Sequence, residues 1–471
     1  MDHTAAPLSL NAPLGEAQYA DLLAALRDEA TGGNYVSGSL IRVEVPLVAV
    51  DALPWLQAQA AQTHYYWASR EGDFEMAGIG EADVLVPDGH LDATGLFRLM
   101  RKRLDLRWPA LRYYGGFRFQ ATDLSQHRWH NFTAFRFIVP RVEVLRRGER
   151  TWLAANIRWT GPDSLEQELA VLSDTLTQLV PVTGDVAIPA LPALLGRVDL
   201  PDRMGWEGLV HRALEAFAAH DLEKVVLARE TEFRFDTEST LDPIGLLRRL
   251  LRHTTQAYEF CFHPTANRAF LGASPERLFH RNNVYLQSEA LAGTRPRGKD
   301  DAEDEAYANA LLGSEKDLRE HRFVVRTLRE HFQRFCSSTH YDEAPSLRQL
   351  HNCQHLYTGI EGILKQHDVD AALVEAFHPT PAVGGVPRQK ALDWLAEHEP
   401  FDRGVYAAPV GWVGFDETEF CVGIRSGLIE GNTLALYSGA GIVPGSRAKD
   451  EWDEIENKMS SFLEALHDGP V

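Results

Sequence analysis

Two segments of the C-terminal half have the hydrophobic spacing of amphipathic helices. In residues 315–335 an apolar stripe recurs every three or four positions and consists of Leu318, His321, Val324, Val325, Leu328 and Phe332. Near the C-terminus a second stripe has the same period and consists of Trp452, Ile455, Met459, Phe462, Leu463 and Leu466. The pattern therefore predicts two long helices, each of which buries one face.

Strand-like segments dominate the rest of the chain. Apolar stretches predict strands at 40–50, 132–145, 224–235, 258–264, 269–279, 284–293, 406–415, 418–431 and 433–443. Further helices are predicted at 164–180, 206–220, 241–254 and 387–398. Hairpins predominate over strand–helix–strand units, so we predict an α+β fold with large, mostly antiparallel sheets wrapped by helices. A Pro- and Gly-rich stretch at 184–208 is expected to connect an N-terminal half, 1–200, with a catalytic region, 201–471.

Composition and charge restrict the partners that the chain can take. Its 471 residues carry a formal net charge of -20, which argues against nucleic acid or an anionic membrane as the main partner. No apolar run approaches the length of a membrane span, and residues 1–18 lack the parts of a secretion signal. The four cysteines lack metal-binding spacing, so we expect neither a disulfide framework nor a zinc site. These features predict a soluble, cytoplasmic protein. They do not forbid a small anionic substrate, because local charges in a cleft can override the overall sign.

Each of the two long helices carries a pair of carboxylates beside its apolar stripe, three residues apart: Asp317 with Glu320, and Glu451 with Glu454. A carboxylate at the edge of a core needs a partner because desolvating an unpaired charge is costly. Such pairs are also common on solvated helix faces, and spacing alone does not bring two helices together. However, a glycine-rich turn at 439–445 precedes the second helix and is suited to an anion. A divalent cation such as Mg²⁺ would join the carboxylates to that anion.

A series of motifs between residues 224 and 458 resembles the chorismate-utilising enzymes. In chain order they are KVVLAR, FLGASPERL, ALAGTRP, EKDLREH, QHL, HPTPAVGGVP, EPFDRGVYAAPVGW, GIRSGLI and GAGIVPGS…EWDEIENK. The N-terminal half resembles the family more loosely, through YYWASREGDFEMAGIGEA and GGFRF, which suggests that it completes one large domain. Within the family the chain is most similar to the isochorismate synthases.

The resemblance implies a Mg²⁺-dependent isomerase that adds water at C2 of chorismate while the C4 hydroxyl leaves. Lys224 matches the water-activating base, which requires burial or a nearby positive charge to favour its neutral amine. Glu276 matches the acid that protonates the leaving hydroxyl, for which a raised pKa is expected. The implied metal ligands are Glu320 and Glu454 directly, with Asp317 and Glu451 through water.

The resemblance also implies how the two carboxylates of chorismate are held. The ring carboxylate would contact Gly293, Thr294 and Lys458. The pyruvyl carboxylate would contact Tyr406, Arg425 and the backbone N–H groups of Gly439 and Gly441, where the absence of a Cβ permits close approach. His355 would lie near the substrate, and both an orienting role and proton transfer are open for it.

Two departures from the family pattern favour water over ammonia as the nucleophile. Anthranilate and aminodeoxychorismate synthases generally have Gln at the position of Lys224, and aminodeoxychorismate synthase tends to have a nucleophilic Lys at the position of Ala292. We therefore expect no amidotransferase subunit, and a monomer. Salicylate synthases share the water-adding residues and then eliminate pyruvate, so this second step stays open. An anthranilate synthase component I and a non-catalytic binding protein are weaker alternatives, and the motifs do not decide between menaquinone and siderophore synthesis.

Overall fold

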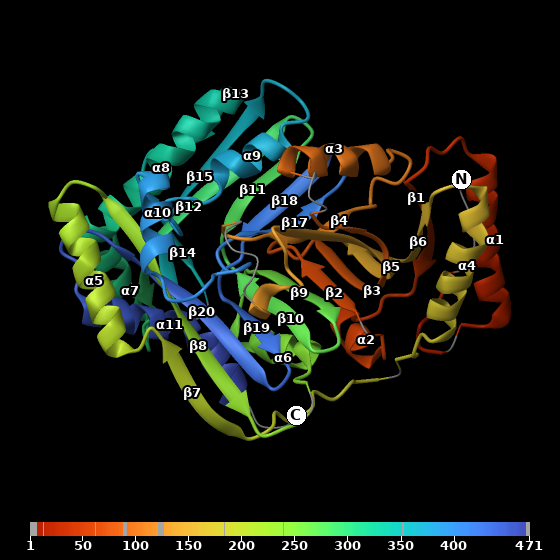
Figure 1. Ribbon diagram of the computed structural model, residues 1–471, viewed down its shortest axis with the longest axis horizontal. Helices are drawn as coiled ribbons and strands as arrows, with labels where there is room; N and C mark the ends of the chain where they lie inside the picture. The colour runs from red at the N-terminus through yellow and green to blue at the C-terminus, as the bar shows by residue number, and fades with distance from the viewer. Residues whose placement is uncertain are drawn as a thin grey trace.

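The computed structural model describes residues 7–467 apart from 13, 62, 88–91, 121–126, 183, 239 and 351–352. Within these ranges twenty strands form one hydrogen-bonded network, and all their pairings are antiparallel. Helices pack on its outside (Figure 1). The predicted α+β class is therefore confirmed. The absence of a secretion signal was predicted from residues 1–18, and of these, residues 1–6 lie outside the described residues.

The network consists of two arms joined at one strand. In pairing order the first arm is β8 (Lys224–Phe235), β20 (Thr433–Ile442), β19 (Ser426–Glu430), β10 (Arg268–Ser274), β9 (Tyr258–Thr265), β2 (His64–Ala68) and β3 (Phe74–Leu85). The second arm is β4 (Tyr113–Phe117), β17 (Pro409–Val413), β18 (Glu417–Val422), β11 (Arg277–Asn282), β12 (Tyr285–Pro296) and β15 (Cys353–Leu364). Strand β5 (Phe135–Arg147) pairs with both β3 and β4 and so joins the arms.

Shorter strands extend both arms. They are β7 (Leu194–Leu200) and β16 (Gly385–Val386) beside β8, β13 (Cys336–Tyr341) and β14 (Ser346–Gln349) beside β15, and β6 (Arg150–Trp159) followed by β1 (Ser39–Leu47) beside β5. Strands of the N-terminal half, β2 and β4, pair with β9 and β17 of the C-terminal half. The two halves thus share one sheet network and one cluster of buried hydrophobic residues.

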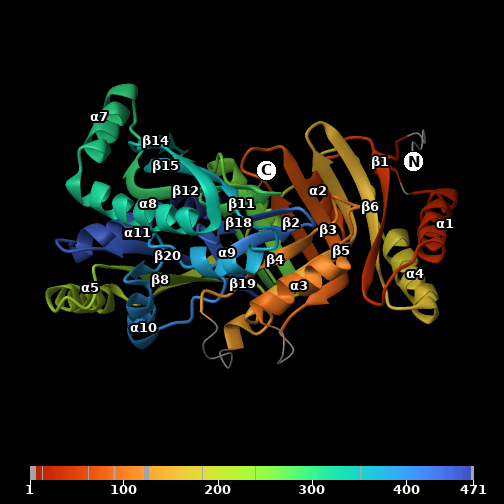
Figure 2. The same ribbon diagram turned by 90° about the horizontal axis from the view of Figure 1, so that it is seen from above.

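Several helices lie at the two ends of the molecule (Figures 1 and 2). At one end lie α5 (Arg203–Ala218), α7 (Asp301–Leu312), α8 (Glu315–Phe335) and α11 (Ala448–His467). At the other end α1 (Glu16–Gly32) packs against α4 (Pro162–Thr177). The remaining helices are α2 (Ala52–Ala58), α3 (Ala93–Arg103), α6 (Pro243–Leu250), α9 (Asp370–Phe377) and α10 (Arg388–His398). No described helix combines the length and the apolar character needed to cross a membrane.

The two predicted long helices form with their expected inner faces. Helix α8 has the predicted bounds, and the side chain of Ser314 caps it by accepting a hydrogen bond from the Asp317 amide. Its buried positions include His321, Val324, Leu328 and Phe332, and it packs on β12 and β15. Helix α11 buries Trp452, Ile455, Met459 and Phe462 and packs on β20. Helix α8 therefore places one acidic pair beside the second arm, and helix α11 places the other pair beside the first arm.

Two predicted strands are wrong in the same way. The segment 269–279 is divided into β10 and β11, and the segment 418–431 into β18 and β19. At each break the chain crosses from one arm to the other, which a single straight strand cannot do. Pro275, which has no N–H for a ladder, stands at the first break, and Arg425 has a left-handed φ of 52° at the second. The apolar pattern runs on through both breaks because both arms are buried.

Two further expectations need correction. The stretch 184–208 is not only a connection, because β7 pairs with β8 and α5 begins at Arg203. The glycine-rich turn expected at 439–445 is mostly strand, since β20 continues to Ile442 and contains both Gly439 and Gly441. The glycines are therefore held in a sheet rather than in a flexible loop.

Candidate active site

The crossings between the two arms bring Glu276 and Arg425 to the wall of one cavity. Glu276 follows β10 and Arg425 precedes β19, and these two strands are paired neighbours in the first arm. We call this space, of ≈ 70 Å³, the inner cavity. Ten of the residues expected in the site line it: Glu276, Gly293, Thr294, Glu320, His355, Tyr406, Arg425, Gly439, Glu454 and Lys458. Four others, Lys224, Asp317, Gly441 and Glu451, lie behind or beside this wall.

Lys224 is fully buried at the start of β8 and is covered by Glu320. Its Nζ lies 2.9 Å from Oε1 of Glu320, which reaches across from α8. A Cβ placed on Gly441 would lie 2.2 Å from that Oε1 and 3.2 Å from Cε of Lys224. Gly441 is thus needed because the two charged side chains pass directly over its backbone.

All four expected metal-binding carboxylates form ion pairs, and we call these the four ion pairs. They are Asp317–Arg295 at 2.6 Å, Glu320–Lys224 at 2.9 Å, Glu451–Lys316 at 2.6 Å and Glu454–Lys458 at 2.7 Å. Although burial opposes it, the nearby charges of Glu451, Glu454 and Glu320 raise the pKa of Lys316. The ammonium group of Lys316 therefore lies close to carboxylates of both helices, which shows that α8 and α11 bring their acidic pairs together.

The donor set can be compared with the needs of Mg²⁺. Among the residues that the structure describes, no group of three or more His, Cys, Asp or Glu side chains is arranged to hold a metal. Mg²⁺ usually takes only one or two carboxylates and completes its shell with water and substrate oxygens. Glu320 and Glu454 face the same cavity and offer such oxygens. The residues therefore fit an ion that protein and an anionic substrate hold jointly.

Glu276 has the environment of a carboxylic acid that stays protonated. It is 4% exposed, and no described residue forms a hydrogen bond or ion pair with its carboxyl group. Burial and the negative charge of Glu289 raise the pKa of Glu276 to about 8. Glu289 itself stays ionised because, against burial, Arg70 lowers its pKa through a hydrogen bond of 2.5 Å. A residue of the N-terminal half thus helps to keep Glu276 neutral.

The register of β20 shows where its glycine N–H groups point. Val226 and Ala228 of β8, which face Gly441 and Gly439 in register, donate their N–H groups to acceptors outside β20. These are consequently the pairs that exchange no hydrogen bonds, and the N–H and C=O groups of both glycines point away from β8. In agreement, Nζ of Lys458 donates to the carbonyl of Gly439 at 2.9 Å. The N–H of Gly439 therefore faces the side on which Lys458 and the inner cavity lie.

His355 is held by both of its ring nitrogens. Its Nδ1 lies 3.2 Å from the carbonyl of Gly293 and 3.1 Å from the Thr294 hydroxyl, at a bulge of β12 where Gly293 has φ of 78°. Because a carbonyl only accepts, Nδ1 must carry a proton in this arrangement. Nε2 lies 3.3 Å from Sγ of Cys353. This geometry favours orientation over proton transfer as the role of His355.

Arg295, Lys316 and Cys353 escaped the sequence interpretation, although each lies next to or within a quoted motif. Arg295 and Lys316 belong to the four ion pairs, and the signal for them was the surplus of carboxylates that each needed a cation. Cys353 directly precedes the QHL motif and contacts Arg425, whose Nη2 lies 3.7 Å from its sulfur. A single cysteine gives no pattern from which this contact could be read.

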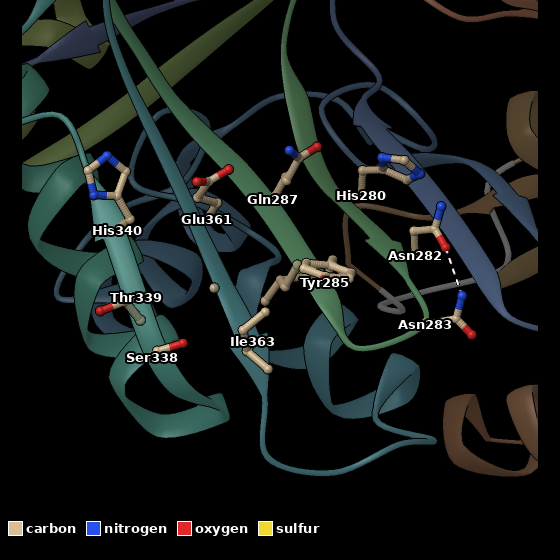
Figure 3. Close-up of a pocket in the computed structure, with 12 residues that line it drawn as sticks. His280, Asn282, Asn283, Tyr285, Gln287, Ser338, Thr339, His340, Glu361 and Ile363 are labelled. Atoms are coloured by element: carbon tan, nitrogen blue, oxygen red, sulfur yellow. Dashed lines mark hydrogen bonds between the residues drawn. The ribbon is translucent and has the colours of Figure 1, made fainter.

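Two other cavities bear on the choice of site. An outer cavity of ≈ 720 Å³ shares Thr294, Arg425, Glu454 and Lys458 with the inner one, so the two adjoin. A third, of ≈ 580 Å³, lies where Tyr285, Gln287 and Glu361 project from neighbouring strands of the second arm (Figure 3). It contains none of the residues expected in the site. The inner cavity with its adjoining outer cavity is therefore the candidate active site.

The chain was also compared with known proteins. The model of the family described as chorismate binding enzyme matches residues 28–467. Isochorismate synthase 2, chloroplastic, of Arabidopsis thaliana is 36% identical over 94% of this chain and 84% of its own length. Isochorismate synthase MenF of Escherichia coli is 33% identical over 91% of this chain and 93% of its own length.

Solved structures agree with this result. The structure of E. coli MenF, described as menaquinone-specific, superposes with a TM-score of 0.82 at 29% identity and covers 95% of this chain and 99% of its own. Anthranilate synthase component I of Streptococcus pneumoniae superposes with a TM-score of 0.64 at 20% identity over 88% and 94%, which shows a shared fold alone.

Proposed function

This chain belongs to the chorismate-binding enzyme family, and on that premise we propose that it is an isochorismate synthase, an isomerase that converts chorismate to isochorismate. Water adds at C2 of the substrate and the C4 hydroxyl departs. The observation that carries the proposal is a protonated acid, Glu276, on the wall of the inner cavity, together with a buried amine, Lys224, which lies directly behind the Glu320 side chain on that wall. Departure of a hydroxyl needs a proton, and addition of water needs a base.

Glu276 supplies the proton to the leaving C4 oxygen. Its pKa of about 8 means that most of the population carries a proton at neutral pH. No side chain among the described residues competes for this proton, so it is available to the substrate oxygen. The carboxylate that remains is reprotonated from solvent after the product has left.

Lys224 activates the attacking water, provided that Glu320 releases it. While the 2.9 Å contact persists, Nζ of Lys224 is occupied by Oε1 of Glu320 and is not available to a water molecule. Water activation is therefore tied to the rearrangement of Glu320.

The substrate's two carboxylates meet the cationic and N–H groups of the inner cavity. Lys458 and the Gly293–Thr294 bulge would hold the ring carboxylate, and Arg425, Tyr406 and Gly439 the pyruvyl carboxylate. Mg²⁺, when bound through Glu320 and Glu454, would neutralise the ring carboxylate and fix its position. Asp317 and Glu451, one turn away on the same helices, would orient its water ligands.

The size of the inner cavity indicates that binding exchanges partners. At ≈ 70 Å³ it is smaller than a usual ligand site, whose volume starts at about 300 Å³. Two ion pairs at the wall of this cavity are the contacts that would open. They are Glu454–Lys458, which lines the wall, and Glu320–Lys224, of which only Glu320 lines it. The chorismate dianion would pair with Lys458, and Mg²⁺ would pair with the carboxylates of Glu320 and Glu454. No charge would then be left unpaired.

One assay tests the function. Purified protein is incubated with chorismate and Mg²⁺, with and without ammonium, and the products are separated by chromatography. Isochorismate as the sole product supports the proposal. Salicylate with pyruvate would instead identify a salicylate synthase, anthranilate formed with ammonium would identify an anthranilate synthase, and unchanged chorismate would contradict a catalytic role.

A further inference from the structure

Cys353 lies at the boundary between the inner and outer cavities. It begins β15 and lines the outer cavity together with Arg297 and Arg425. Its sulfur lies 3.3 Å from Nε2 of His355 and 3.7 Å from Nη2 of Arg425. The same Arg425 donates from Nη1 to the carbonyl of Lys458 at 2.7 Å. The thiol is therefore coupled to three residues that line the inner cavity.

The surroundings of Cys353 differ from those of the other cysteines. Burial alone would raise the pKa of Cys353, but the charges of His355 and Arg425 lower it to about 6. Burial raises the pKa of Cys336 to about 11 and also raises the pKa values of Cys261 and Cys421. All four are free thiols. Of the four, Cys353 is the cysteine whose pKa is lowered, and it lies on the wall of the outer cavity. The thiolate is the reactive form of cysteine.

We propose that Cys353 is a peroxide-sensitive modification site that adjoins the substrate-binding residues. In the reaction the Cys353 thiolate attacks one oxygen of a hydroperoxide. A sulfur–oxygen bond forms, the oxygen–oxygen bond breaks, and hydroxide or alkoxide leaves with the electron pair. The sulfur is oxidised to a sulfenic acid while the peroxide is reduced. A dithiol reverses the change by reducing the sulfenic acid to the thiol.

The modification is expected to weaken substrate binding through Arg425 and His355. The sulfenic acid is neutral and larger than the thiolate, so the attraction that holds the Arg425 guanidinium beside the sulfur is lost. The added oxygen also enlarges a side chain on the wall of the outer cavity, which Arg425 and Lys458 line as well. This consequence rests on the proposed function, because Arg425 and His355 are substrate contacts only if chorismate binds here.

Chemical labelling tests the site without any activity assay. The full-length protein is treated with hydrogen peroxide in the presence of dimedone, which traps sulfenic acids, and the cysteine-containing peptides are quantified by mass spectrometry. We expect Cys353 to be labelled at least about tenfold faster than Cys261, Cys336 or Cys421. Equal labelling of the four, or labelling of another cysteine in preference to Cys353, would overturn the proposal.

Activity measurements test the consequence. Peroxide should lower kcat/KM for chorismate about tenfold or more, mainly by raising KM, and dithiothreitol should restore it. Cys353→Ser should keep its own untreated kcat/KM after peroxide, whereas Cys336→Ser, the matched control, should remain as sensitive as the wild type. Equal loss in Cys353→Ser would refute the coupling. If untreated protein does not convert chorismate, the proposed function fails, while the labelling still decides whether Cys353 is the reactive thiol.

Discussion

Replacement of Glu276 by Gln is expected to make the folded protein more stable while it removes activity. Gln has nearly the size of Glu but cannot ionise, so it keeps the packing and removes the buried charge. The rise of the Glu276 pKa from 4.5 to about 8 means that the folded protein disfavours the ionised form. At ~1.36 kcal/mol per pKa unit this preference amounts to ~5 kcal/mol.

The sign of the effect follows from proton linkage. Between pH 4.5 and about 8 the folded protein keeps a proton on Glu276 that the unfolded chain has lost, so the free energy of unfolding falls as the pH rises. The free energy of unfolding of Glu276→Gln does not show this decrease, because Gln does not ionise. Integrating between the two pKa values, we expect Glu276→Gln to be more stable than the wild type by ~1 kcal/mol at pH 5 and by ~4 kcal/mol at pH 8.

Urea unfolding at pH 5, 6.5 and 8 measures this difference. The wild type and the variant are compared at each pH, so the titration of other groups cancels. Glu397→Gln, which removes an exposed carboxylate on α10, is the matched control and should show no such trend. A stability difference that does not change with pH would refute the assignment of Glu276 as a buried, protonated acid.

The same residue should limit activity at high pH. If Glu276 must be protonated to release the C4 hydroxyl, kcat/KM of the wild type should fall with an apparent pKa near 8. Glu276→Gln should lower turnover by about two to four orders of magnitude. Full activity of the variant would show that another group supplies the proton.

The other substitutions address the base, the cation and the glycine backbone. Lys224→Gln should lower turnover by at least about a hundredfold with an unchanged circular dichroism spectrum; near-normal turnover would remove Lys224 from its role. Glu320→Gln and Glu454→Gln should each weaken Mg²⁺ binding by about tenfold or more, measured by calorimetry, and full wild-type activity in chelator would contradict a metal role. Gly441→Ala should impair turnover because its Cβ would clash with Glu320, whereas Gly196→Ala, where nothing lies within 4 Å, should behave as the wild type.

The sequence predicted the elements of this fold better than their connections. The helix α8 and the strand β8 were predicted with the bounds that the structure has, because α8 has one helical period along its length and β8 is a nearly continuous buried stretch. The alternation of apolar and polar residues along a strand does not mark the point at which the chain passes from one arm to the other. The crossings before β11 and β19 were therefore missed, although they position Glu276 and Arg425.

The site was predictable in its residue types but not in its pairings. The acidic pairs and the glycines stood out as local patterns, and ten of the expected residues line one cavity. Lys458 stands four positions after Glu454, so spacing does record that pair. The other three pairs join different segments through tertiary contacts that no spacing records. The raised pKa of Glu276 likewise depends on Glu289 and Arg70, which lie 13 and 206 positions away in the chain.

The four ion pairs also indicate why an acidic protein can accept a dianion. Each of the four carboxylates expected to bind the metal already has its own cation, so these four pairs add no net charge to the site despite the net charge of -20. Chorismate with two carboxylates and one Mg²⁺ form a pair that is neutral as well. Binding can therefore proceed by exchange of partners, without burying an unpaired charge. Mg²⁺ and chorismate should accordingly bind with positive coupling, since either one alone leaves released lysines or carboxylates unpaired. Calorimetric titration of Mg²⁺ with and without chorismate measures this coupling, and equal affinities would show that the two bind independently.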